Sequence, residues 1–323
     1  MAERTAGPGG EVPLVTASRS MPPLTPGRIW YLLRTTCREG WSTPYWREVV
    51  RGRILRTPPV ETPGSSACEI HVLTSHGDWL NLVWGLKSLF WYSGVEHALC
   101  IHEDGSLGEV ELGHLGSHFP SARILPRHGA DKEMESVLSN APLCRGFRAT
   151  NPLALKVFDF SHFLRAERML LLDSDILFFG PVQTLAERIK DPGYRLNTLN
   201  RDWSFGYSVP PDVVSERCGY DLPPLINSGL GLLHAGSIDV RHCEELLGIP
   251  GVLGHPHRIE QTLIAACSAR HGFEFLPREY DVALACSEPD HPCKHYTGPI
   301  RHLMYREGMR RLVRAGILEK GRA

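Results

Sequence analysis

Two aspartates interrupt an otherwise apolar run of the chain. Asp173 and Asp175 lie on either side of Ser174, within a run from Met169 to Phe179 that predicts a buried strand. Buried carboxylates are costly unless a cation or hydrogen bonds offset their charge. Residues i and i+2 of a strand point to the same side, so both side chains could bind one ion, and carboxylates favour Mg²⁺ or Mn²⁺. Such an ion readily bridges phosphate oxygens. The alternative is that the pair caps the turn before Gly180.

The elements that must position this pair alternate between strands and helices. Hydrophobic patterns predict strands at 69–75, 97–103, 121–126, 168–179, 194–200, 226–234 and 273–282, and helices at 78–92, 153–164, 181–190, 257–270 and 302–317. The alternation over 69–200 predicts an α/β fold, with a mostly parallel central sheet and helices on both faces. Such sheets bind ligands at the carboxyl ends of their strands.

Composition excludes several classes of protein. The chain has 323 residues, 42% of them apolar, and a net charge of −1, so it has no basic field for nucleic acid and we expect no such partner. Its longest apolar runs are too short to span a bilayer. The nine cysteines include no C-x-x-C pair, which argues against a zinc ribbon or a thioredoxin-type motif. We expect reduced, buried cysteines in a cytoplasmic protein.

The first 67 residues differ in composition from the rest. Residues 1–27 are rich in Pro, Gly, Ser and Thr and predict a disordered leader without an apolar signal region. Residues 28–56 interleave arginines with Trp and Tyr and predict two short helices, followed by a linker to 67. This arm is either a peripheral contact with a membrane or acceptor, or a helical arm that packs its aromatic side chains on the main domain. Residues 318–323 form a tail.

Four segments then carry a family resemblance, in order along the chain. They are RMLLLDSDILFFGPV at 168–182, INSGLGLLH at 226–234, IEQTLIA at 259–265 and HYTGPIR at 295–301. The first resembles the D-x-D segment of GT-A-fold glycosyltransferases of the family 8 type, which includes glycogenin and bacterial galactosyltransferases. The others resemble that family's N-[SA]-G strand, D-Q-x-x-L helix start and H-x-x-G-x-x-K loop. Glu260 and Arg301 replace the family's Asp and Lys, and the K-P-W ending is missing, which indicates a divergent member.

The resemblance implies one GT-A-type domain over 68–317, with a Rossmann-like half for a nucleotide-sugar and a second half for the acceptor. It implies that Asp173, Asp175 and His295 hold Mn²⁺ or Mg²⁺, and that Asn227, Gln261 and Arg301 act beside the donor sugar and its phosphates. The remaining donor-binding candidates lie on loops and on one helix: Thr74, Ser75, Asp104, Lys156, Ser174 and Gly298. Asp104 could equally form a turn, and Lys156 could equally be solvated.

The predicted activity is therefore transfer of a sugar from a nucleotide-sugar, such as a UDP-sugar, to a glycan, lipid or small-molecule acceptor, with retention. One alternative is a sugar-phosphate nucleotidyltransferase, which usually has a glycine-rich basic loop after the first strand; this chain has TSHGDWLN there. Another is a non-catalytic protein that binds a nucleotide-sugar or carbohydrate on the same scaffold.

Overall fold

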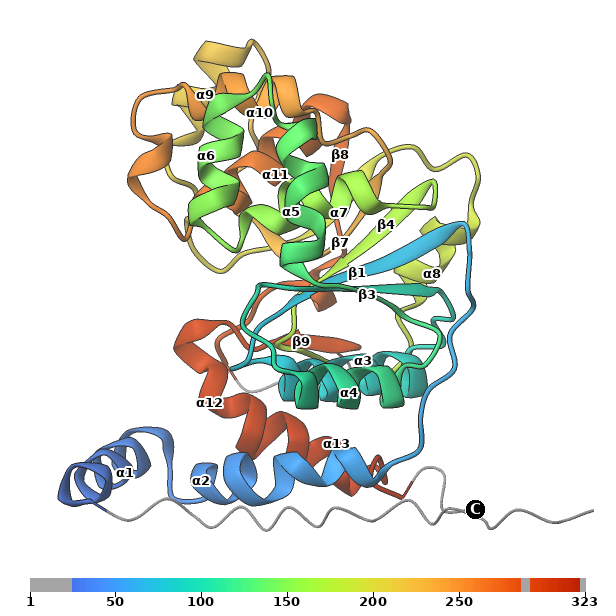
Figure 1. Cartoon of the computed structure of the whole chain (residues 1–323), viewed down its shortest axis with the longest axis vertical. Coiled ribbons are helices and arrows are strands. Elements are labelled where there is room, and N and C mark those ends of the chain that lie inside the picture. Colours follow the sequence, from blue (N-terminus) through green and yellow to red (C-terminus); the bar gives the residue numbers. More distant parts are fainter. Residues whose placement is uncertain (1–24, 286–290, 320–323) are drawn as a thin grey trace, which may run out of the picture.

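A seven-stranded sheet lies at the centre of the computed structural model, which describes residues 25–285 and 291–319 (Figure 1). Its strands, in spatial order, are β3 (Arg123–Leu125), β2 (Ala98–Glu103), β1 (Cys68–Thr74), β4 (Arg168–Leu172), β7 (Ile226–His234), β6 (Asn197–Arg201) and β8 (Phe273–Phe275). The first four are mutually parallel and β8 is parallel to β6, whereas β7 is antiparallel to both of its neighbours. The predicted mostly parallel α/β sheet is therefore confirmed.

The prediction of one strand over 168–179 is wrong. β4 ends at Leu172, the chain turns at Asp173–Asp175, and β5 (Ile176–Phe178) pairs with β9 (Cys293–His295) in a separate two-stranded sheet. Apolar residues continue through both strands because β4 and β5 are each buried. The aspartates therefore lie in a turn, and the argument that they share one side of an extended strand does not hold.

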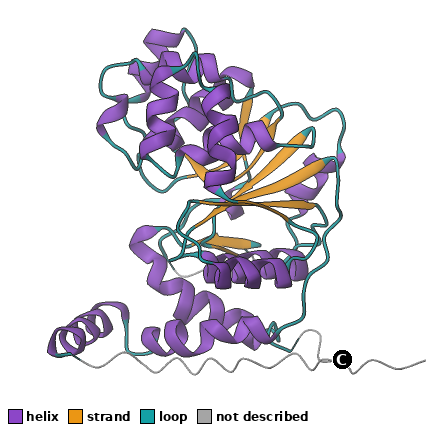
Figure 2. Cartoon of the chain, viewed as in Figure 1, coloured by secondary structure: helices purple, strands orange, loops and turns teal. Residues whose placement is uncertain are grey.

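Helices cover both faces of the central sheet (Figure 2). The α-helices that follow β1 and precede β8 in the chain are α3 (Trp79–Tyr92), α4 (Glu109–His118), α5 (Arg127–Val137), α6 (Pro142–Thr150), α7 (Ala154–Phe163), α8 (Gln183–Lys190), α9 (Pro211–Cys218), α10 (Val240–Leu247) and α11 (Ile259–His271). After β9 come η5 (Gly298–Ile300), α12 (Arg301–Leu303), the π-helical turn η6 (Met304–Met309) and α13 (Arg310–Arg314). Figure 1 shows α3 and α4 below the sheet and α5, α6, α7, α10 and α11 above it.

Alternate residues of the strands pack into two hydrophobic cores, one on each face of the sheet. On β4, Leu170 and Leu172 pack into the core shared with α3 and the C-terminal helices. Met169 and Leu171 pack on the opposite side, with α6, α7 and α11. Because successive side chains of a strand point to opposite faces, one apolar strand supplies both cores. This burial fixes the strand end that carries the aspartates.

The sequence patterns missed α4, α5, α6, α9 and α10, which are only 8 to 11 residues long and give too few turns for a helical period to stand out. The sequence of α5, RHGADKEMESV, buries only Ala130 and Met134. The predicted strand over 273–282 is also too long, because Pro277 has no N–H to continue a ladder and the chain enters the 3₁₀ turn η4 (Arg278–Tyr280).

The basic arm is helical; most of the described side chains of its first helix are exposed to solvent, and its last turns pack on the main domain. It consists of α1 (Pro26–Glu39), α2 (Thr43–Tyr45), the π-helical turn η1 (Trp46–Val50) and the 3₁₀ helix η2 (Arg51–Arg56). Val50 and Ile54 are buried, and the Trp84 indole of α3 donates to the Arg51 carbonyl at 2.8 Å. Figure 1 shows α1 standing away from the body of the molecule. Residues 1–24 of the leader predicted at 1–27 lie outside the described residues, whereas Pro26 and Gly27 begin α1.

Candidate active site

The turn between β4 and β5 presents the two aspartates at the carboxyl end of β4. The Asp173 N–H donates to the Gly229 carbonyl of β7 at 2.8 Å, and the Tyr296 N–H donates to the Asp175 carbonyl at 2.9 Å. Backbone hydrogen bonds to two different segments therefore hold the turn. A side chain that must meet a ligand in a fixed place benefits from this rigidity.

His295 completes a cluster with the two aspartates. It pairs with Ile176 in the β5–β9 ladder, and its Nε2 lies 3.1 Å from Asp175 Oδ1 and 3.6 Å from Asp173 Oδ2. The ligand atoms of the three side chains all lie within 4.8 Å of one another. Gly229 makes room for the ring, because a Cβ there would lie 2.3 Å from His295 Cε1. The first and fourth segments of the resemblance thus meet beside a glycine of the second.

The ring of His295 is oriented by Asn227. The Nδ1–H of His295 donates to Asn227 Oδ1 at 3.1 Å, and the same oxygen accepts the Gly229 N–H at 3.0 Å. Nε2 is thereby turned toward the carboxylates. Burial by itself would lower the pKa of His295, but the charges of Asp175 and Asp173 outweigh it and raise the pKa. The protonated imidazole can therefore form an ion pair with the carboxylates, and the neutral imidazole can bind a metal.

Arg301 joins this cluster to the start of α3. Its Nη2 donates to Asp175 Oδ2 and its Nη1 to Asp78 Oδ1, both at 2.6 Å. Burial would raise the pKa of Asp175, yet His295 and then Arg301 lower it, so this carboxyl is ionised. Asp78 was not predicted as a site residue. Its position just before a helix is typical of a capping residue, and only the fold brings it to Arg301.

Lys156 is buried against the other aspartate. Its Nζ lies 2.8 Å from Asp173 Oδ1 and 2.9 Å from Glu260 Oε1, and it donates to the Ser228 carbonyl at 3.0 Å. Burial favours the neutral amine, but the charges of Asp173 and Glu260 raise the pKa of Lys156 above its ordinary value. The solvated alternative for Lys156 is therefore wrong. Glu260, for which the sequence predicts no role, is the partner that balances this lysine.

Asn227 and Gln261 form a second polar group beside His295. Both amides donate to Asp202 Oδ2, from Asn227 Nδ2 at 3.0 Å and from Gln261 Nε2 at 3.3 Å. Gln261 Oε1 in turn accepts from Asn227 Nδ2 at 3.4 Å. Asp202 is the anchor of this group, and nothing in its local sequence singled it out. The two amides are thus fixed next to the cluster of Asp173, Asp175 and His295.

A cavity of about 480 Å³ opens in front of the aspartates, a volume typical of small-molecule sites. The predicted residues that line it come from the ends of β1, β2 and β4, from α7 and from α12: Thr74, Ser75, Asp104, Lys156, Asp173, Ser174, Asp175 and Arg301. Thr74 Oγ1 is buried and lacks a hydrogen-bond partner among the described residues. Asp104 also forms a turn, since its Oδ1 accepts from the Ser106 N–H at 3.0 Å.

Four predicted residues do not line this cavity, namely His295, Asn227, Gln261 and Gly298. Asn227 and Gln261 lie behind the cluster that His295 completes. Gly298 lines a neighbouring cavity with Glu39, Arg47, His302 and Tyr305, and Arg301 borders both cavities. Asn151 and His257 also line the main cavity, and no sequence pattern pointed to them because they lie on loops that are distant along the chain.

Replacing Lys156 with methionine is expected to lower the free energy of unfolding by about 2 kcal/mol, the scale for leaving a buried charged partner unmatched. The loss depends on pH. Burial raises the pKa of Glu260 above its ordinary 4.5, so the folded state holds this proton more tightly than the unfolded state. Stability therefore falls as pH rises from that ordinary value through the raised folded pKa, and without Lys156 the deficit grows over this window.

Urea denaturation near pH 5 and near pH 8 measures this effect. Lys132→Met, an exposed lysine on α5, is the matched control and should change little at either pH. Adding Glu260→Gln to the Lys156→Met variant should flatten the dependence on pH. An equal loss of stability at both pH values would contradict the assignment of Glu260 as the uncompensated partner.

Comparisons with known proteins agree with this architecture. No protein-family model and no curated protein matches the sequence. A solved structure of the galactosyltransferase LgtC, in complex with donor and acceptor sugar analogues, is similar at a TM-score of 0.50 and 15% identity, over 78% of this chain and 96% of that one. Mouse xyloside xylosyltransferase 1 gives a TM-score of 0.46 at 15% identity, over 75% and 99%. The mannosyltransferase Ktr4p from S. cerevisiae gives 0.42 at 10% identity, over 72% and 79%. The likeness to LgtC establishes the fold, and this chain has the GT-A-type fold of glycosyltransferases.

Proposed function

We propose that this protein is a metal-dependent glycosyltransferase that moves a sugar from a UDP-sugar to a glycan, lipid or small-molecule acceptor. One observation carries the proposal. The ligand atoms of Asp173, Asp175 and His295 lie within 4.8 Å of one another, and the two aspartates line a cavity at the carboxyl ends of β1, β2 and β4. This is the place where α/β sheets bind nucleotides. The GT-A-type fold supports the same reaction class.

The donor atoms of the cluster fit a divalent cation. Two carboxylates and an imidazole nitrogen favour Mn²⁺ over Mg²⁺, because imidazole is a softer ligand than oxygen. The surrounding cations Lys156 and Arg301 already pair with the two carboxylates, so the site is built around concentrated negative charge. When bound, the metal would stabilise the charge that develops on a diphosphate leaving group.

The chain's own residues would bind and orient the donor. Arg301 borders the cavity, and its guanidinium can bind phosphate oxygens through two N–H groups. Thr74 Oγ1, which has no hydrogen-bond partner in the described part of the chain, lies with Ser75 and Asp104 where a nucleoside would enter, and Ser174 lies between the two proposed metal ligands Asp173 and Asp175. Gly298 would let the backbone of the loop 295–301 approach the phosphates as it folds over them.

The amides of Asn227 and Gln261 would hold the donor sugar. Their shared acceptor Asp202 is occupied by both side chains, so it is poorly placed to take a proton from an acceptor hydroxyl. An inverting transferase needs a free carboxylate base at that hydroxyl. We therefore propose retention of configuration at the sugar.

Incubation with a panel of UDP-sugars and Mn²⁺, with UDP and pyrophosphate both measured, tests the proposal. Release of UDP supports a glycosyltransferase. Release of pyrophosphate would instead identify a nucleotidyltransferase. Neither product, together with tight binding of UDP, would identify a non-catalytic binding protein.

The arm suggests where the acceptor is held. The structure exposes 69% of Trp30 and 78% of Trp41, with Leu33 and Tyr45 also exposed, while η2 packs on the domain. No helix among the described residues has both the length and the hydropathy required to cross a bilayer. We propose that the exposed aromatic side chains and nearby arginines contact the cytoplasmic surface of a membrane peripherally, next to a lipid-linked or soluble acceptor.

Flotation with anionic liposomes measures this contact. Binding is expected, and it should weaken as salt rises because arginines attract anionic headgroups through a screened charge interaction. Changing Trp30 and Trp41 together to serine should reduce binding, whereas the exposed Leu253→Ser, far along the chain on η3 (Val252–Gly254), should not. Binding that is insensitive to both salt and these tryptophans would overturn the proposed contact.

A further inference from the structure

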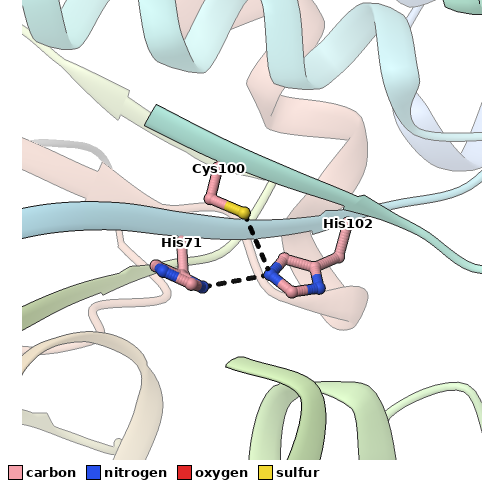
Figure 3. Close-up of side chains that lie close together, drawn as sticks. All are labelled: His71, Cys100 and His102. Atoms are coloured by element: carbon pink, nitrogen blue, oxygen red, sulfur yellow. Dashed lines mark hydrogen bonds between the residues drawn. The ribbon is translucent and has the colours of Figure 1, made fainter. Parts of the chain in front are cut away.

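A second cluster of metal-ligating side chains lies in the core, away from the cavity. His71 on β1 and Cys100 and His102 on β2 are all buried, and Figure 3 shows them pointing toward one another. The parallel register pairs His71 with Cys100, and residues i and i+2 of β2 share a face. His71 Nδ1 lies 3.0 Å from His102 Nε2, and Cys100 Sγ lies 3.4 Å from the same nitrogen.

The protons available to this cluster cannot satisfy all three groups. His71 Nε2–H donates to Glu69 Oε2 at 3.0 Å, so in the neutral ring Nδ1 is an acceptor. If His102 Nε2–H donates to His71 Nδ1, then His102 Nε2 has no lone pair left to accept a hydrogen bond from the Cys100 thiol. If the thiol donates to His102 Nε2 instead, two nitrogen lone pairs face each other at 3.0 Å. The first arrangement leaves only the weakly polar thiol of Cys100 without a partner, whereas the second leaves the two rings unpaired, so without an ion the three groups are never all bound at once.

A metal ion removes this conflict, because all three lone pairs can point at it. We propose that His71 Nδ1, Cys100 Sγ and His102 Nε2 bind one Zn²⁺ ion, separate from the metal proposed at Asp173 and Asp175. Tetrahedral zinc places two nitrogens ~3.3 Å apart and nitrogen and sulfur ~3.6 Å apart. The observed separations of 3.0 and 3.4 Å reach these values with small side-chain shifts. Thiolate and imidazole ligands select zinc over Mg²⁺.

The surroundings of the cluster match those of a metal-binding histidine. Glu69 orients His71 from behind, and Glu69 is itself held by Arg123 Nη2 at 2.8 Å from its Oε1. Such carboxylate–histidine pairs fix the ring and raise its basicity as a ligand. Burial lowers the pKa of His71 and of His102, which keeps both rings neutral. Burial also raises the pKa of the Cys100 thiol to about 12, so a thiolate forms here only against a cation.

Binding of Zn²⁺ releases one proton to solvent, because the Cys100 thiol becomes a thiolate as the S–Zn bond forms. The ion would join β1 to β2 a few residues before both strands end at the cavity, where Thr74 and Asp104 lie. Phe160 closes the site, with its ring centroid 4.5 Å from that of His102, and the three side chains would leave the fourth tetrahedral position of the ion to a water molecule. Because the site is buried, the ion would be taken up as the chain folds.

Zinc per chain, measured by mass spectrometry, tests the site on full-length protein made in zinc-supplemented cells and dialysed against excess Mg²⁺. One zinc per chain is expected in the wild-type protein, in Cys68→Ala and in Asp175→Asn. Cys68 is a matched control, being buried on β1 but packed in the opposite core. Cys100→Ser and His102→Gln should each hold less than about a tenth of that amount, because a site with three protein ligands loses most of its affinity when one of them is removed.

Cobalt substitution gives a second readout that needs no variant. A Co²⁺-loaded wild-type protein should show a thiolate-to-cobalt charge-transfer absorption, which the carboxylate and imidazole cluster cannot produce. Absence of zinc and of this absorption in the wild-type protein would overturn the proposal, as would zinc retained by Cys100→Ser. Neither result would bear on sugar transfer, so the two proposals fail independently.

Discussion

Replacing Asp175 with asparagine is expected to lower sugar transfer on the order of 10³-fold, because one charged ligand of the metal is lost while the side-chain shape is kept. Asp175 also meets His295 at 3.1 Å and Arg301 at 2.6 Å, so the variant leaves two cations without their shared anion. The rate of UDP release across a Mn²⁺ titration measures the loss. Half-saturation should move to higher Mn²⁺, and UDP binding should lose its dependence on the metal.

Asp212→Asn is the matched control, since it removes an exposed carboxylate from α9 and should leave the rate unchanged. A thermal melt of both variants separates loss of the site from loss of the fold. Full activity of the wild-type protein in excess EDTA would contradict the proposed metal site, whatever rate the Asp175→Asn variant shows.

Removing the side chain of Arg301, as Arg301→Ala, is expected to lower kcat by about 10²–10³, the scale for losing one preorganised partner of a developing anion. Donor affinity should fall less, because the leaving diphosphate carries more charge in the transition state than in the bound donor. Steady-state kinetics with the donor varied at saturating Mn²⁺ separate kcat from KM.

Arg301→Lys is the informative variant. One ammonium can replace the charge but cannot span Asp78 and Asp175 as the two Nη groups do, so we expect partial recovery of kcat. Arg310→Ala, an exposed arginine on α13, controls for the lost charge and should be silent. An unchanged kcat in Arg301→Ala would mean that the loop 295–301 does not hold the phosphates, and Lys156 would be the next candidate.

Much of the candidate site could be read from the chain because its residues lie in short, ordered segments. The aspartate pair is visible as charge inside an apolar run, and a buried charge demands a partner. His295 and Arg301 became candidates only through the resemblance of HYTGPIR to a family loop. The alternation of strands and helices was enough for the fold class, since apolar periodicity is a local property of the sequence.

Other features depend on partners that are distant along the chain. The turn at Asp173–Asp175 was missed because an apolar pattern does not distinguish one buried strand from two that join different sheets. Glu260 and Asp78 are ordinary residues near helix starts until the fold sets them beside Lys156 and Arg301. The short helices were missed because 8 to 11 residues give too few turns to show a clear period, and helices of this length depend on tertiary contacts for their stability.

The sequence by itself therefore determined which residues carry charge into apolar surroundings, and this was enough to predict a cation site and, with the apolar periodicity, an α/β fold. Only the tertiary structure decided which side chains meet, as the cluster of His71, Cys100 and His102 on β1 and β2 illustrates. His71 and Cys100 are 29 positions apart with no motif between them, yet the parallel register makes them neighbours. Periodicity is encoded along the chain, whereas strand register and the balance of buried charge arise only when distant segments pack together.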